Sequence, residues 1–156
     1  MPLTIRPATE NDQLAIRRLI AEVHLPGMNL QWPNFVVAEE DQEIVGMGQV
    51  KSHGDGSREL ASIALGPKQQ GEGVGTAVIK TLLGREVGVV LHLSCRRELE
   101  GYYERFGFGR VEGAEYPPYF QRTTRMANLI TRFFGIHLIV MRREVAVHKH
   151  LRDEGP

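Results

Sequence analysis

The sequence predicts a mixed α/β (α+β) domain built on a central, mostly antiparallel, twisted sheet of six to seven strands with helices on both faces. Two observations predict this class. In the first half of the 156-residue chain, short apolar stretches alternate with tight turns, which favours an antiparallel meander. In the second half a strand–helix–strand unit follows, and such a unit places its two strands parallel. The length suits one domain, residues 1–156.

Composition excludes several classes of protein. The chain has 19 basic and 19 acidic residues, and this balance argues against a nucleic-acid-binding protein. No signal-peptide core and no run of about 18 apolar residues is present, so we expect no membrane partner. The single cysteine, Cys95, cannot form an internal disulfide, which suits a cytoplasmic protein. The six histidines lack zinc-ligand spacing, so no metal is expected.

The first half of the chain is predicted element by element from apolar periodicity and turn residues. In order we expect a strand at Leu3–Arg6, a helix at Thr9–Val23, an irregular segment at His24–Pro33 and the two strands of a hairpin at Phe35–Glu39 and Glu43–Val50. A Gly/Asp turn at Ser52–Ser57 and another strand at Glu59–Leu65 follow. Gly46 and Gly48 lie inside the second hairpin strand, where glycines often indicate a bulge or a close backbone approach.

The second half begins where Gly66 and Pro67 end the preceding strand, since Pro67 has no N–H to donate to a sheet. We then expect a helix at 76–83 with Gly84 as its C-cap or kink, a buried strand at 87–94, and a helix at 96–106 that is stopped by Gly107. Two further strands, at 108–111 and 136–141, flank an extra helix at 119–134, and a polar tail follows at 146–156. Alternation along Glu59–Leu65 predicts that Glu59, Ala61, Ile63 and Leu65 share one strand face.

A glycine-rich turn, Gln70–Gly75, joins a strand to the start of a helix. Glycines allow a ligand to approach the backbone closely, and the first N–H groups of a helix lack internal partners and carry the positive end of its dipole. The turn is therefore predicted to hold phosphate. It is not a P-loop, because no Lys precedes Thr76, and it lacks the acidic residue that a dinucleotide site places about 20 residues further on.

Two motifs in this region resemble those of a known superfamily. The Gln70–Gly75 segment fits Gln/Arg-x-x-Gly-x-Gly/Ala, and Tyr103–Phe108 fits Tyr-x-x-x-Gly-Phe. In this order and separation they resemble the GNAT superfamily of N-acetyltransferases. The resemblance implies the GNAT-like acyl-CoA N-acyltransferase fold, with its parallel pair at a central splay, and acetyl-CoA as cosubstrate.

The resemblance also implies which residues bind the cofactor. The turn would hold the pyrophosphate and the preceding strand edge would pair with the pantetheine amides. Arg96 stands where the superfamily often has Asn. Glu72 stands where it often has Lys or Arg, and a carboxylate there would weaken CoA binding unless it points to solvent. The expected cofactor residues are Ile63, Leu65, Gln70, Gly71, Gly73, Val74, Gly75, Thr76 and Arg96.

Two residues are expected to be catalytic. Glu59 lies 11 residues before Gln70, the spacing at which some members of the superfamily carry a general base. A partly buried carboxylate can take a proton from an amine that is protonated at neutral pH. Tyr103, by its motif, would donate a proton to the leaving thiolate. The alternatives are a solvated glutamate beside Arg58 and a tyrosine that serves only packing; Cys95 is expected to be a structural thiol.

In the superfamily the segment after the first helix walls the acceptor pocket, and the corner before the extra helix is a second wall candidate. The expected acceptor contacts are Met28, Asn29, Gln31, Trp32, Tyr116 and Tyr119. For Met28 and Trp32 the alternative is that they only cover the edge of the core.

The function expected from these residues is transfer of the acetyl group of acetyl-CoA to a primary amine of a small molecule, by direct attack in a ternary complex. The alternatives are acetylation of a protein lysine or N-terminus, and a catalytically silent CoA-binding regulatory module. If the chain forms a homodimer, the last strand and the extra helix are the expected interface.

Overall fold

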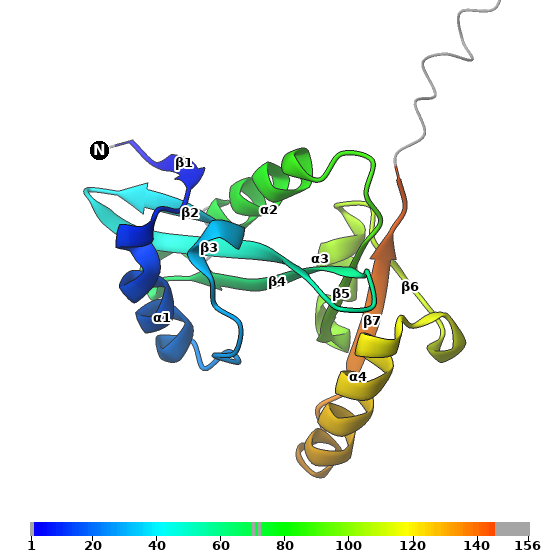
Figure 1. Cartoon of the computed structure of the whole chain (residues 1–156). Coiled ribbons are helices and arrows are strands. Elements are labelled where there is room, and N and C mark those ends of the chain that lie inside the picture. Colours follow the sequence, from blue (N-terminus) through cyan, green and yellow to red (C-terminus); the bar gives the residue numbers. More distant parts are fainter. Residues whose placement is uncertain (1, 70, 72, 146–156) are drawn as a thin grey trace, which may run out of the picture.

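The computed structural model describes residues 2–69, 71 and 73–145. Seven strands form one sheet in the order β1-β2-β3-β4-β5-β7-β6 (Figure 1). The strands are β1 (Thr4–Pro7), β2 (Phe35–Glu40), β3 (Glu43–Ser52), β4 (Arg58–Leu65), β5 (Leu91–Arg96), β6 (Gly109–Arg110) and β7 (Leu138–Arg143). The α-helices are α1 (Gln13–Glu22), α2 (Val74–Arg85), α3 (Glu100–Glu104) and α4 (Pro118–Thr131).

The predicted fold class is confirmed. Strands β1 to β4 form an antiparallel meander, and β5, β7 and β6 pair antiparallel as well. Strands β4 and β5 are the parallel pair, and they share a single residue pair, Glu59 with His92. Beyond Glu59, β4 continues to Leu65 without a β5 partner, so the sheet splays open at its centre.

Helices cover both faces of the sheet (Figure 1). On one face α2 packs against a large apolar cluster that includes Val78, Ile79, Leu60 and Leu93. On the other face α1 packs against a second cluster. Helix α4 lies against β7 on this second face, where its Phe120 packs with Val140. The apolar stripes read from the sequence are thus buried against the sheet.

A β-bulge in β4 changes which side chains share a face. Met47 pairs with Ala64 but Gln49 pairs with Ala61, so Ser62 and Ile63 lie opposite Gly48 alone, and Ser62 has φ +57°. The prediction that Glu59, Ile63 and Leu65 share one face is therefore wrong. Ile63 and Leu65 pack with the α2 cluster together with Leu60, whose side chain points away from that of its neighbour Glu59.

Gly48 makes room for this bulge. A Cβ at residue 48 would lie 2.5 Å from Cδ1 of Ile63 and 2.9 Å from Cδ1 of Leu82. The glycine that the sequence marked as a bulge or a close approach serves as both.

Several element boundaries differ from the predictions. Helix α2 begins at Val74 and runs to Arg85, so Gly84 is a helical residue and not a cap. The predicted 96–106 helix is a 3-10 turn at Arg97–Leu99 followed by the short α3, and Gly107 ends it with φ +91° as expected. A helix, α4, occupies Pro118–Thr131 where the extra helix was expected, whereas the predicted tail at 146–156 lies outside the described residues. Among the helices described, none is long and apolar enough to cross a membrane.

Candidate active site

The open edge of β4 is the first part of the candidate site. Because only Glu59 of β4 pairs with β5, the backbone N–H and C=O groups from Leu60 to Leu65 on this edge have no partner strand. The side chains of Ile63 and Leu65 pack into the α2 cluster and hold the strand in place. An extended ligand that carries amide groups can therefore add to this edge as a strand would.

The glycine turn follows directly at the end of β4. Gly71 and Gly73 have φ +86° and +80°, a left-handed conformation that L side chains rarely adopt. Gly73 is the N-cap of α2, and no side chain of a described residue caps this helix end. The first N–H groups of α2, at Val74, Gly75 and Thr76, have no acceptor within the helix. Gln70, which was also predicted to bind the cofactor in this turn, lies outside the described residues, as does Glu72.

Tyr102 joins this turn, although the sequence analysis did not identify it. A Cβ at Gly75 would lie 3.3 Å from Cδ1 of Leu65 and 3.4 Å from the Tyr102 hydroxyl, so the tyrosine reaches the start of α2. Its position beside the motif residue Tyr103 gave no signal of that contact. Arg96, in contrast, is mostly exposed, and its guanidinium lies 3.9 Å from the carboxylate of Glu98.

Tyr103 lies on α3 and packs against the α2 cluster, with its ring 6.3 Å from that of Phe108. Burial and the nearby Cys95 raise the pKa of Tyr103 above its usual value, so the phenol keeps its proton at neutral pH. Burial also raises the pKa of the Cys95 thiol to about 11. Cys95 is a buried free thiol, as the sequence analysis expected, and is poorly suited to act as a nucleophile.

Glu59 lies where β4 and β5 meet, and its carboxylate is largely buried. Its Oε1 is 2.9 Å from Nε2 of His53, with 12% of the Glu59 side chain and 8% of the His53 side chain exposed. The alternative of a solvated glutamate at the start of the strand is thus wrong. Arg58, its neighbour in sequence, pairs instead with Glu86 on the other side of the strand.

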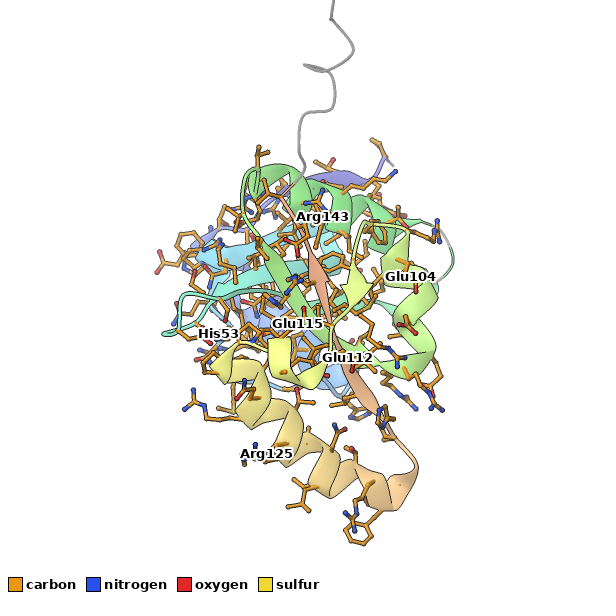
Figure 2. The ribbon with its side chains drawn as sticks, turned by 90° about the vertical axis from the view of Figure 1, so that its right-hand side faces the viewer. His53, Glu104, Glu112, Glu115, Arg125 and Arg143 are labelled. Atoms are coloured by element: carbon orange, nitrogen blue, oxygen red, sulfur yellow. The ribbon has the colours of Figure 1, made fainter. Side chains whose placement is uncertain are left out.

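His53 is the functional candidate that sequence reasoning missed. It lies in the Gly/Asp turn after β3, where a histidine normally signals nothing. In the structure its imidazole stacks on Tyr119, with ring centroids 3.4 Å apart. Figure 2 shows His53 beside the start of α4. The structure therefore brings Glu59 and the predicted acceptor residue Tyr119 together through His53.

The loop after α1 forms the other side of the site. Nζ of Lys51 donates a hydrogen bond to the backbone oxygen of Met28 at 3.3 Å, and Lys51 pairs across the sheet with Glu59. Met28 is 74% exposed, which does not fit the core-edge alternative for this residue. Asn29 beside it has a left-handed φ of +57°, and Gln31 is exposed.

Two of the predicted acceptor residues are tied to the core. Trp32 packs with the α1 cluster, and its backbone N–H donates to Oε1 of Gln13, as the core-edge alternative predicted. Tyr116 packs with Val111, Phe120 and Val140. No contact between Tyr116 and Glu59 is observed among the described residues.

His92 lies next to Glu59 in the sheet and has a buried ring nitrogen, Nδ1, without a hydrogen-bond partner among the described residues. Burial, with a contribution from Arg142, lowers the pKa of His92, so the ring is neutral. Across the described residues no group of three His, Cys, Asp or Glu side chains is arranged to hold a metal ion.

Residues 31–110 match the family described as Acetyltransferase (GNAT) domain. No curated protein matches the chain in sequence.

Among solved structures, N-acetylglutamate synthase from Neisseria gonorrhoeae, complexed with coenzyme A and N-acetyl-glutamate, matches 94% of this chain at 18% identity and a TM-score of 0.75. This chain spans only 36% of that protein's length. The ribosomal-protein-S18-alanine N-acetyltransferase from Escherichia coli matches 95% of this chain and 98% of its own, at 18% identity and a TM-score of 0.63. At these identities the structures show a shared fold.

Proposed function

This chain belongs to the GNAT family of acetyltransferases, and from that premise we propose that it transfers the acetyl group of acetyl-CoA to a primary amine of a small molecule. The observation that carries the proposal is the position of Glu59. This shielded carboxylate lies at the one point where β4 and β5 pair, and the open strand edge and the glycine turn follow it along the same strand.

The described residues fit acetyl-CoA, which supplies the reactive thioester when bound. The open edge from Leu60 to Leu65 offers backbone groups to the pantetheine amides. The left-handed glycines and the uncapped N-terminus of α2 offer N–H groups to the pyrophosphate. The hydroxyl of Tyr102 lies close enough to Gly75 to contribute a further hydrogen bond there. Solved relatives of the same fold are complexed with coenzyme A.

In the proposed mechanism the two catalytic side chains move the protons. Glu59 accepts a proton from the ammonium of the acceptor, and the neutral amine then attacks the thioester carbonyl. Tyr103, kept protonated by its burial, donates a proton to the departing thiolate, and the phenolate takes the second proton of the nitrogen, which leaves a neutral amide. Attack is direct, because Cys95 is a buried thiol with a raised pKa and does not carry the acyl group. That single buried thiol also suits the cytoplasm, which we propose as the compartment.

A small amine is favoured because the approach to Glu59 is bordered on two sides. The Met28 loop is tied to Lys51 on one side, and α4 is docked on the turn after β3 on the other. Among proteins of the same fold, the synthase from N. gonorrhoeae was complexed with N-acetyl-glutamate, which is a small acetylated amine. The E. coli enzyme is named for an alanine of ribosomal protein S18, so a protein acceptor is the second candidate.

The test is release of the CoA thiol from acetyl-CoA in the presence of separate amines. The panel contains amino acids, a polyamine, a lysine peptide and a peptide with a free N-terminus, and products are identified by mass spectrometry. We expect at least one small amine to be acetylated faster than either peptide. Turnover of the peptides alone would replace the small-molecule proposal by the protein acceptor. Binding of acetyl-CoA without turnover of any amine would favour a silent CoA-binding module.

The same assay tests the two catalytic assignments. Loss of thiol release in Glu59→Gln and in Tyr103→Phe, with acetyl-CoA binding kept, supports the roles given to these residues. Unchanged turnover in both variants would contradict those roles while leaving the family unaffected.

A further inference from the structure

We propose that His53 is a positioning residue for Glu59, and that α4 holds His53 in place through Tyr119. The proposal rests on the proposed function in one respect, namely that Glu59 is the base. It gives a role to a histidine outside both sequence motifs and to a helix that the family motifs do not cover.

The first observation is the asymmetry of the Glu59 carboxylate. Its Oε1 contacts Nε2 of His53 at 2.9 Å. Its Oε2 accepts no hydrogen bond from any described residue. This oxygen is not fully buried, so solvent reaches it. One carboxylate oxygen is therefore held by the imidazole, and the other is free to receive a proton from an amine.

The second observation is how tightly the imidazole is held. Tyr119 stacks on one face of the ring, with an interplanar angle of 14°. Phe120 meets it edge-on at 89°, with the ring centroids 6.2 Å apart. These two aromatic side chains come from the first turn of α4, whereas His53 comes from the turn between β3 and β4. A ring packed in this way has little freedom to rotate away from Glu59.

The third observation is that α4 is docked on the same turn. The backbone N–H of Tyr119 donates to Oδ2 of Asp55 at 2.9 Å, and Oδ1 of Asp55 accepts from the N–H and hydroxyl of Ser57. The Ser57 hydroxyl and the Tyr119 N–H hold the pKa of Asp55 at about 2, so this carboxylate is charged at neutral pH. A carboxylate at a helix N-terminus is also favoured by the helix dipole. Asp55 thus fixes where α4 places Tyr119.

These contacts specify the chemistry of the pair. When His53 is neutral, contact with a carboxylate selects the tautomer that carries the proton on Nε2, and this N–H donates to Oε1. The acceptor ammonium then gives its proton to Oε2, and its lone pair attacks the thioester carbonyl. The C–N bond forms, the C–S bond breaks and CoA leaves as the thiol, while the His53 hydrogen bond to Oε1 is kept throughout. His53 orients the base and does not touch the substrate.

Titratable or charged groups from every neighbouring element face the pair of His53 and Glu59. Asp55 shares the turn with His53, Lys51 lies across the sheet from Glu59 on β3, and His92 is its neighbour on β5. From α4, Tyr119 lies on the imidazole with Arg122 nearby. A change in activity with pH has to be assigned by variants of the pair itself.

The direct test uses ¹⁵N-histidine-labelled protein and nuclear magnetic resonance, with His53→Gln used to assign the signal. Wild-type protein should show a slowly exchanging, downfield Hε2 proton on Nε2 of His53. This signal should disappear in Glu59→Ala, which removes the acceptor, weaken in Tyr119→Ala and persist in Tyr119→Phe, which keeps the stacked ring. An unchanged His53 signal in Glu59→Ala would overturn the proposal. This arm needs no acceptor, so it gives a result even if acetyl transfer fails.

The kinetic test uses acetyl-CoA and the fastest amine of the panel. His53→Ala should lower kcat by up to about 100-fold, the cost of misplacing a catalytic group by about an ångström, while KM for acetyl-CoA stays unchanged. His53→Gln can place its amide nitrogen near the position of Nε2 and should recover most of the lost kcat. Wild-type kcat in His53→Ala would overturn the proposal. So would equal losses of kcat in both variants together with lowered thermal stability, because that outcome indicates a purely structural role.

Discussion

The two halves of the candidate site are built in different ways. The proposed cofactor half, made of the β4 edge and the glycine turn, is defined by backbone: an unpaired strand edge, two left-handed glycines and a helix start. The proposed acceptor half, made of His53, Glu59, Met28 and Tyr119, is defined by side chains from segments far apart in the chain. The first half therefore suits a ligand shared by a whole family, and the second allows each chain its own acceptor.

The largest expected effect is a loss of kcat in Glu59→Gln without a loss of acetyl-CoA binding. Glu59→Gln removes the proton acceptor but keeps the shape of the side chain and can still meet His53. We expect kcat to fall by about 10²-fold to 10⁴-fold, the usual range for general acid–base catalysis, with the acetyl-CoA dissociation constant unchanged. Steady-state kinetics and calorimetry measure the two quantities.

The matched control for this variant is Glu86→Gln. Glu86 is another partly buried glutamate, held by Arg58 at 2.6 Å, and it has no place in the proposed chemistry. Its replacement should lower stability without lowering kcat. If both variants lose the same activity, the loss reflects folding, and the base assigned to the acceptor half is wrong.

The second prediction concerns the β-bulge in β4, which places the side chain of Glu59 on one face of the sheet and those of Ile63 and Leu65 on the other. A methyl group at residue 48 would overlap Ile63 and Leu82, which lie 2.5 and 2.9 Å from the added Cβ. Gly48→Ala should therefore lower the free energy of unfolding by about 1–3 kcal/mol, the usual cost of overpacking a core. Urea denaturation measures the change. Gly54→Ala is the control, since its Cβ meets open space, and equal stability of the two variants would contradict the packing of the bulge.

The contiguous parts of the site could be predicted from the sequence, whereas the contacts between distant segments could not. The glycine turn and the tyrosine motif are contiguous, so the sequence alone could single out Gly71, Gly73 and Tyr103 as candidate site residues of a GNAT-like chain. The bulge at Ser62 was not placed, because its register depends on packing between Gly48 and α2. The His53 contacts depend on where α4 docks, and no local pattern around a turn histidine specifies a partner more than 60 residues away.

The same reasoning explains the fold. All seven strands were predicted, because alternation and turn residues are local signals. Boundaries were less well predicted where tertiary contacts decide them: β5 begins at Leu91, where pairing with β7 starts, although the apolar stretch begins at Val87. Gly84 was misread as a C-cap or kink, because the helix continues one residue beyond it, to Arg85.

The third prediction tests the backbone definition of the cofactor half. Gly73→Ala places a Cβ in open space but in a left-handed conformation that costs an L residue about 1–2 kcal/mol. If the turn relaxes to avoid this strain, its N–H groups no longer point at the pyrophosphate. We therefore expect the dissociation constant of acetyl-CoA, measured by calorimetry, to rise about 10-fold. Gly84→Ala, the same substitution inside α2, should leave the constant unchanged and stabilise the helix by up to about 1 kcal/mol. Unchanged affinity in Gly73→Ala would remove the turn from the site.

The smallest effect is confined to alkaline pH. The pKa of Tyr103 is raised in the folded protein, so above about pH 10 the unfolded chain loses this proton while the folded chain keeps it. The free energy of unfolding then falls as pH rises, by up to about 1.4 kcal/mol per pH unit from this group. Tyr103→Phe should show a shallower decline between pH 10 and 12 in urea denaturation. An identical decline would mean that the phenol is not shielded as the structure shows.

Thermal unfolding with and without acetyl-CoA, alongside NAD and ATP, tests the central claim most directly. Ligand at about 100 times its dissociation constant stabilises the native state by about 2.7 kcal/mol, and each kcal/mol raises Tm by roughly 2–4 °C for a domain of this size. We predict a rise of several degrees with acetyl-CoA and none with the other two nucleotides. An absence of any rise with acetyl-CoA, or a larger rise with NAD or ATP, would contradict the assignment of the glycine turn and the β4 edge to this cosubstrate.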